Sequence, residues 1–92
     1  HSISILAAAR EINEELYRNI SEIHFEEHQD PIFYTAEFGI PVVIGREQVG
    51  INLVKFESFW KSVVAKSGAQ QLQYIDLRFE DQVVVRWNHA PA

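Results

Sequence analysis

The chain has 92 residues, which is enough for one small domain with a modest core and too few for two. Hydrophobic residues make up 47% of it, so it is expected to be globular and not disordered. Its net charge of −5 argues against nucleic-acid binding and against an anionic membrane surface. The absence of cysteine excludes disulfides, thiolate metal sites and thiol nucleophiles. No apolar run is long enough to span a bilayer and no signal peptide is present, so we expect any membrane anchor to lie outside this sequence.

Two segments have the spacing of amphipathic helices. Apolar residues recur at three- and four-residue steps from Ile5 to Ile20, which predicts a helix over residues 4–19. The same spacing from Leu53 to Val64 predicts a second helix that ends near Gly68. Trp60 lies on the apolar side of this second helix, where core packing is its expected role.

Between these helices the period changes to two, which is typical of strands. The pattern predicts strands near residues 22–26, 32–38 and 40–44, joined as an antiparallel meander. A C-terminal hairpin follows the second helix. The expected fold is therefore α+β, with an antiparallel sheet (three-strand meander plus hairpin), two helices packed on one face, and the order α-β-β-β-α-β-β. Residues 1–92 are expected to form a single domain.

The C-terminal hairpin covers residues 74–87. Cross-strand pairing of apolar residues favours a three-residue loop at residues 80–82, which would place Ile75 opposite Trp87 and Leu77 opposite Val85. Asp76 would face away from the apolar side and form a structural pairing with an arginine or with backbone N–H groups. The last strand is apolar on both faces and has no lysine or proline, so we expect a sheet edge that can accept a partner strand. The alternative is a central strand covered on both sides.

The segment 24–28 matches H-x-x-E-H, a zinc motif that requires both histidines on one helical face. The alternation around it predicts a strand instead, so His24 and His28 are expected to be solvent-facing polar residues. A helix at this position would favour the alternative function, a small metal-dependent hydrolase. No catalytic residue, metal or cofactor is expected.

Three blocks resemble the outer domain of the FtsQ/DivIB cell-division proteins. The first is Ile44-Gly45-Arg46 followed by Leu53 and Phe56, with Lys55 in the position of a basic residue; the others are YIDLRF at residues 74–79 and the closing strand 83–87. The resemblance covers about residues 20–87 and identifies the chain as a fragment of this β domain. One departure is Gln82, which stands where the family's turn usually has glycine; a left-handed backbone at this glutamine would cost free energy.

The resemblance implies a non-catalytic divisome scaffold on the extracytoplasmic (periplasmic) side of the inner membrane, at the division septum. A transmembrane helix would anchor the full-length protein. The implied partners are FtsB/DivIC-like and FtsL-like proteins, of which the former would add a strand to the last strand of the sheet. The implied contact residues are Arg78, Phe79, Val83, Val84, Val85 and Trp87. An unrelated protein-binding module would differ from this only in its partner.

Overall fold

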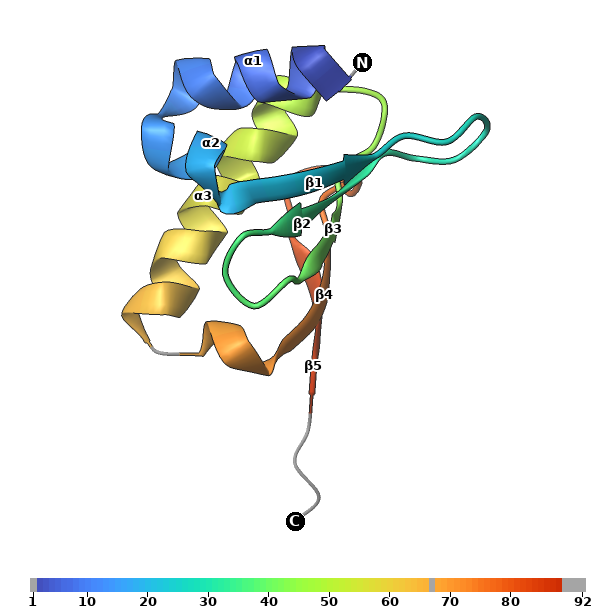
Figure 1. Ribbon diagram of the computed structural model, residues 1–92. Coiled ribbons are helices and arrows are strands. Elements are labelled where there is room, and N and C mark those ends of the chain that lie inside the picture. Colours follow the sequence, from blue (N-terminus) through green and yellow to red (C-terminus); the bar gives the residue numbers. More distant parts are fainter. Residues whose placement is uncertain (1, 67, 89–92) are drawn as a thin grey trace.

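The structure, a computed structural model, describes residues 2–66 and 68–88. Its helices are α1 (Ser2–Ile12), α2 (Glu14–Asn19), α3 (Val49–Ala65) and the short 3₁₀ helix η1 (Ala69–Gln71). Its strands are β1 (Ile20–His24), β2 (Ile32–Thr35), β3 (Pro41–Val43), β4 (Leu72–Asp76) and β5 (Val84–Trp87). The helices α1, α2 and α3 lie on one side of a five-stranded sheet, so the predicted α+β class is confirmed (Figure 1).

The strands follow the chain order β1-β2-β3-β4-β5 across the sheet. The first three form the predicted antiparallel meander, and β4 and β5 form the predicted hairpin. These two parts meet at β3 and β4, which run parallel, with Val42 opposite Ile75. Parallel neighbours require a crossover connection, and α3 supplies it. The parallel pair was not part of the sequence prediction, although the helix between the third and fourth strands leads to it.

The prediction of one continuous helix over residues 4–19 is wrong at Asn13. This residue has extended backbone angles, with φ −171° and ψ 163°, and separates α1 from α2. Its side chain accepts a hydrogen bond from the backbone N–H of Leu16 at 2.7 Å. Asparagine is a strong N-cap residue because its side chain satisfies a helical N–H that has no backbone partner. The apolar period continues through the break, so it gave no sign of the cap.

The predicted register of the C-terminal hairpin is also wrong. Ile75 lies opposite Val85 and Asp76 opposite Val84, so the pairing is displaced by two residues and ends at that pair. Residues 77–83 then form a connection longer than the predicted three-residue loop. The residue with a left-handed backbone in this connection is Asp81, with φ 58°, and not Gln82. Aspartate adopts that conformation more readily than most residues, so the departure at Gln82 does not strain the turn.

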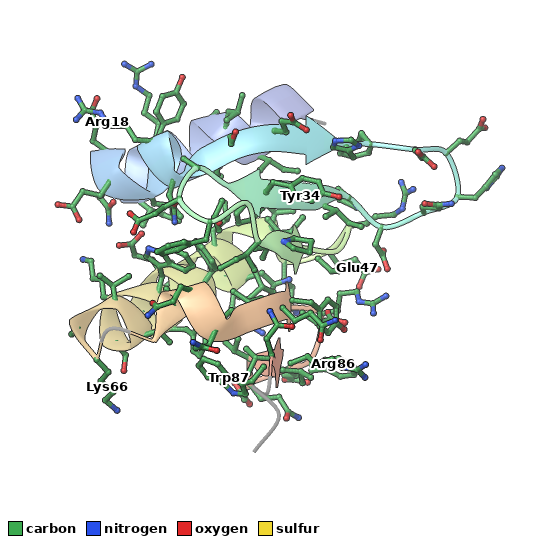
Figure 2. All side chains as sticks on the ribbon, turned by 60° about the horizontal axis from the view of Figure 1, so that its bottom comes forward. Arg18, Tyr34, Glu47, Lys66, Arg86 and Trp87 are labelled. Atoms are coloured by element: carbon green, nitrogen blue, oxygen red, sulfur yellow. The ribbon has the colours of Figure 1, made fainter. Side chains whose placement is uncertain are left out.

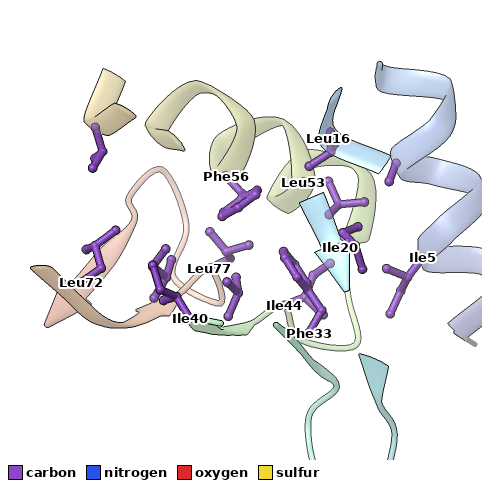
Figure 3. Close-up of a cluster of buried hydrophobic side chains, with 14 of the residues drawn as sticks. Ile5, Leu16, Ile20, Phe33, Ile40, Ile44, Leu53, Phe56, Leu72 and Leu77 are labelled. Carbon is purple, nitrogen blue, oxygen red and sulfur yellow. The ribbon is translucent and has the colours of Figure 1, made fainter. Parts of the chain in front are cut away.

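The core lies between the helices and the covered face of the sheet (Figure 3). Phe33 of β2 and Phe56 of α3 are fully buried, and their rings meet edge to face with centroids 5.2 Å apart. Trp60 lies beside Phe56 and is only partly buried, so its predicted core role is confirmed in part. No helix within the described residues is both long and apolar enough to cross a membrane.

Candidate functional site

The strand β5 is the last strand of the sheet in space as well as in the chain. It pairs with β4 on one side, and no other described strand pairs with its outer side. The predicted edge position is therefore confirmed. Its sequence, Val-Val-Arg-Trp, contains neither lysine nor proline, the residues that commonly protect an edge strand from further pairing.

The two faces of β5 differ in what they contact. Val85, together with Val83 just before the strand, packs against the core on the helix side, and Val84 lies opposite Asp76 on the other face. Figure 2 shows Arg86 and Trp87 leaving β5 in opposite directions. Trp87 remains 37% exposed, while its ring lies close to Gly68, where an added Cβ would meet it at 3.9 Å. Trp87 is thus partly packed and partly accessible.

A carboxylate network holds the end of β4. Asp76, only 1% exposed, accepts hydrogen bonds from the Arg78 side chain, with Nε 2.9 Å from Oδ1 and Nη2 2.6 Å from Oδ2. It also accepts the Arg78 backbone N–H at 3.0 Å and the Tyr74 hydroxyl at 3.0 Å. Arg78 Nη1 extends to Asp30 at 2.8 Å. The predicted structural pairing of Asp76 is confirmed.

These contacts shift three pKa values. Burial by itself would raise the pKa of Asp76, but the hydrogen bonds from Arg78 and Tyr74 outweigh it and lower that pKa below its ordinary value. Hydrogen bonds to Asp76 and Asp30 raise the pKa of Arg78. Burial, followed by the bond to Asp76, raises the pKa of Tyr74. Asp76 and Arg78 therefore both stay ionised at neutral pH and form a structural ion pair.

Lys55 holds the connection between β4 and β5 from the helix side. Its Nζ donates to the carbonyls of Leu77 at 2.9 Å, Phe79 at 2.6 Å and Gln82 at 3.2 Å. The ammonium therefore binds carbonyls at both ends of the connection. This tie links the middle of α3 to the segment that precedes β5.

The segment after β3 ties the neighbouring connections together. Arg46 Nη2 donates to the carbonyls of Glu26, at 3.0 Å, and Gln29 in the β1–β2 connection. Gly45 has φ 83°, and a Cβ there would lie 3.1 Å from Cγ of Arg78. The I-G-R and Y-I-D-L-R-F blocks, far apart in the chain, therefore meet in space. The residues of these two blocks act here as structural ties.

Two hollows lie beside this region. A polar cleft of about 410 Å³ is lined by Asp30, Gly45, Arg46, Glu47, Gln48, Asn52, Arg78, Phe79 and Glu80. A more apolar groove of about 900 Å³ runs between α3 and the end of the β4–β5 connection; Ile51, Val54, Phe59 and Val83 are among its lining residues. Within the cleft, Arg78 pairs with Asp30, and Arg46 binds backbone carbonyls.

The structure brings the predicted contact residues together around β5 but not all in the strand. Arg78, Phe79 and Val83 lie in the connection before it, and Phe79 is 45% exposed. Arg78 already pairs with two carboxylates, so its charge is largely neutralised within the chain. Arg86 is exposed, and none of the described residues forms an ion pair with it. Sequence reasoning missed Asp30 and the tie made by Lys55, because neither contact is local in the chain.

His24 ends β1, as the sequence predicted, and its Nε2 lies 3.0 Å from Oε2 of Glu22. His28 lies in the following turn with φ 69°, and its imidazole is exposed. The helical face that H-x-x-E-H requires is therefore absent from this segment. Across the described residues, no three histidine, aspartate or glutamate side chains gather closely enough to hold a metal ion.

Comparison with known proteins agrees with the resemblance found in the motifs. The chain matches the family described as FtsQ/DivIB, C-terminal related, over residues 2–86. It is 31% identical over 68 residues to the cell division protein FtsQ of Geobacter sp. (strain M21), covering 74% of this chain and 24% of that protein. It is 28% identical over 67 residues to the FtsQ of Geotalea daltonii, covering 73% of this chain and 24% of that protein. The match thus spans about a quarter of each relative, and the chain belongs to the FtsQ/DivIB, C-terminal related family.

Proposed function

We propose that this domain is a non-catalytic scaffold in bacterial cell division and that β5 accepts a strand from a partner protein. The observation that carries the proposal is the outer side of β5, with which no other described strand pairs; the strand has two valines and a tryptophan and contains neither lysine nor proline. Main-chain hydrogen bonds would set the register of the added strand. Both named relatives are cell division proteins, which supports the cellular role.

The partner we propose is an ectodomain of the FtsB/DivIC type, with an FtsL-type protein in the same assembly. The proposed contact residues remain Arg78, Phe79, Val83, Val84, Val85 and Trp87. Phe79 and Trp87 supply partly exposed aromatic surface, which is the kind of side chain that dominates interface energies. We also propose that the domain lies on the extracytoplasmic side of the inner membrane and is part of a longer protein that an N-terminal transmembrane helix anchors.

Binding of the cognate FtsB/DivIC-type ectodomain, measured by calorimetry, tests this proposal. Trp87→Ala is expected to weaken binding by about 2 kcal/mol, or roughly thirtyfold in Kd, because it removes an aromatic anchor. Val84→Lys places a charge on the outer strand and is expected to weaken binding at least tenfold. Circular dichroism checks that each variant remains folded.

The matched control is Ser21→Lys, which adds the same side chain to β1 at the opposite edge of the sheet. Its affinity is expected to equal that of the wild type. If Trp87→Ala and Val84→Lys bind as tightly as Ser21→Lys and the wild type, strand addition at β5 is ruled out. Failure of the wild-type domain to bind would rule out the proposed partner.

A further inference from the structure

Lys55 occupies an unusual place for a lysine on a surface helix. It lies between the buried core residues Leu53 and Phe56, and it is itself half-buried. Its ammonium has three N–H donors, and three carbonyl oxygens lie within hydrogen-bond distance of it. The side chain is thus fully engaged with the backbone of the β4–β5 connection and is not a solvated surface charge.

The connection has few other ties of its own. The strand ladder ends at Asp76 and Val84. Within the turn itself, the backbone N–H of Gln82 reaches the carbonyl of Phe79 at 3.4 Å, which is a long hydrogen bond. Lys55 binds the carbonyls of Phe79 and Gln82 and so closes the turn from the helix side. Without it, the hydrogen bonds that tie this segment to the rest of the described chain would lie at its beginning, at Leu77 and Arg78, and its end would be held by the packing of Val83.

We propose that Lys55 is the positioning residue that holds the β4–β5 connection in the conformation a partner strand requires. This inference rests on the proposed function of β5. The Phe79 carbonyl accepts a hydrogen bond from Lys55 while the Phe79 ring is exposed, so the tie orients an aromatic side chain that faces solvent. Gln82 lies two residues before Val84, where β5 begins, so the same tie holds the chain just ahead of the outer strand. A preordered edge loses less conformational entropy on binding, which increases affinity without adding a contact.

A purely structural role for Lys55 would have different consequences. A tie that only stabilises the whole fold would, when removed, increase hydrogen exchange throughout the sheet. A positioning tie would increase exchange in the connection and in β5, while β1 and β2 keep their protection. Local exchange and partner affinity should then change together, at nearly constant thermal stability.

The experiment compares Lys55→Met, which keeps most of the aliphatic stem and removes the donors, with Lys55→Arg, which keeps a charged donor. For Lys55→Met we expect amide exchange over residues 79–85 to increase about tenfold, and affinity for the FtsB/DivIC-type ectodomain to fall about tenfold. Lys55→Arg should recover most of both losses. Lys66→Met, at the exposed C-terminal end of α3, is the matched control and should match the wild type in both measurements. Lys55→Gln is measured in parallel in case the methionine variant does not fold.

Each outcome separates this inference from the proposed function. Unchanged exchange over residues 79–85, a uniform increase across the sheet, or unfolding of both Lys55→Met and Lys55→Gln would overturn it. A local increase in exchange with undiminished affinity would also overturn it and leave strand addition intact. If the wild-type domain does not bind the ectodomain, the proposed function fails and Lys55 is only a tether of the connection.

Discussion

The two edges of the sheet differ in the side chains they present and in how their connections are held. At one edge, β1 exposes Glu22 and His24, which interact with each other. At the other, β5 presents valines, an arginine and a tryptophan. Charged side chains on an edge oppose pairing with another chain, whereas an apolar edge favours it. The difference indicates that β5 is the edge suited to a partner.

The connections next to these edges are also tied differently. At the β1 side, Arg46 bonds exposed carbonyls of the β1–β2 connection, near the surface. At the β5 side, buried Asp76 holds Arg78, and Lys55 holds the backbone of the β4–β5 connection. The ties on the β5 side are more deeply buried and more numerous. We therefore expect substitutions there to have larger effects than substitutions near β1.

The largest expected effect belongs to Asp76→Asn. The neutral amide removes the buried charge that Arg78 binds and places an NH2 group against its donors, so the free energy of unfolding should fall by about 3 kcal/mol. Chemical denaturation measures it. The control is Glu22→Gln on β1, where an exposed pair contributes less than about 0.5 kcal/mol. Equal effects of the two substitutions would remove the contrast between the edges.

The stabilisation that Asp76→Asn removes should depend on pH. The pKa of Asp76 is lowered in the folded protein, so its contribution to stability is complete above the ordinary carboxyl range and is lost as the pH falls through the lowered value. The difference in unfolding free energy between wild type and Asp76→Asn should stay constant from about pH 7 to pH 5 and shrink below about pH 4. A difference that persists undiminished at low pH would assign the stabilisation to another group.

Gly45→Ala tests the packing behind the β5 side. Its φ of 83° disfavours alanine, and the added Cβ would press on Arg78 at 3.1 Å, so we expect a loss of about 1–2 kcal/mol in unfolding free energy. Gly39→Ala is the matched control, since Gly39 has φ 58° and open space around it. The excess loss at Gly45 measures the contact with Arg78. No excess would mean that Arg78 moves aside freely.

Arg86→Glu tests the charge of the proposed interface. Because Arg78 is neutralised within the chain, Arg86 is the exposed cation of β5 and would attract an acidic partner residue. Reversing its charge should weaken ectodomain binding by about 1 kcal/mol at low salt, and the loss should diminish at high salt. Ser21→Glu, at the β1 edge, is the control and should leave affinity unchanged. A loss that does not depend on salt would point to a packing role for Arg86.

The smallest effect is expected for Arg46→Met. The guanidinium bonds two exposed carbonyls, so its loss should increase amide exchange in the β1–β2 connection and change the unfolding free energy by less than about 1 kcal/mol. Exchange in β5 should not change. Increased exchange at β5 would show that the two edges are coupled through the cleft that Arg46 and Arg78 share.

Much of the fold could be predicted from patterns that are local in the chain. The three-residue and two-residue periods located α3, the meander and the C-terminal strands, because burial of one face imposes these periods on any helix or strand. The same patterns correctly predicted an apolar outer strand and a structural pairing for Asp76. The blocks of residues around Gly45 and Leu77 were sufficient to identify the family.

The tertiary structure decided what depends on contacts between distant residues. Periodicity continues unchanged across Asn13, so only the cap geometry shows that the first helix is two helices. Apolar pairing alone predicted a different hairpin register. In the observed register, Lys55 binds carbonyls of the β4–β5 connection, and Asp76 accepts a hydrogen bond from the backbone N–H of Arg78. Likewise, the pairing of Arg78 with Asp30 joins residues far apart in the chain, and no local pattern predicts it. A sequence specifies which faces are buried, but hydrogen-bond partners distant in the chain are settled only when the elements pack together.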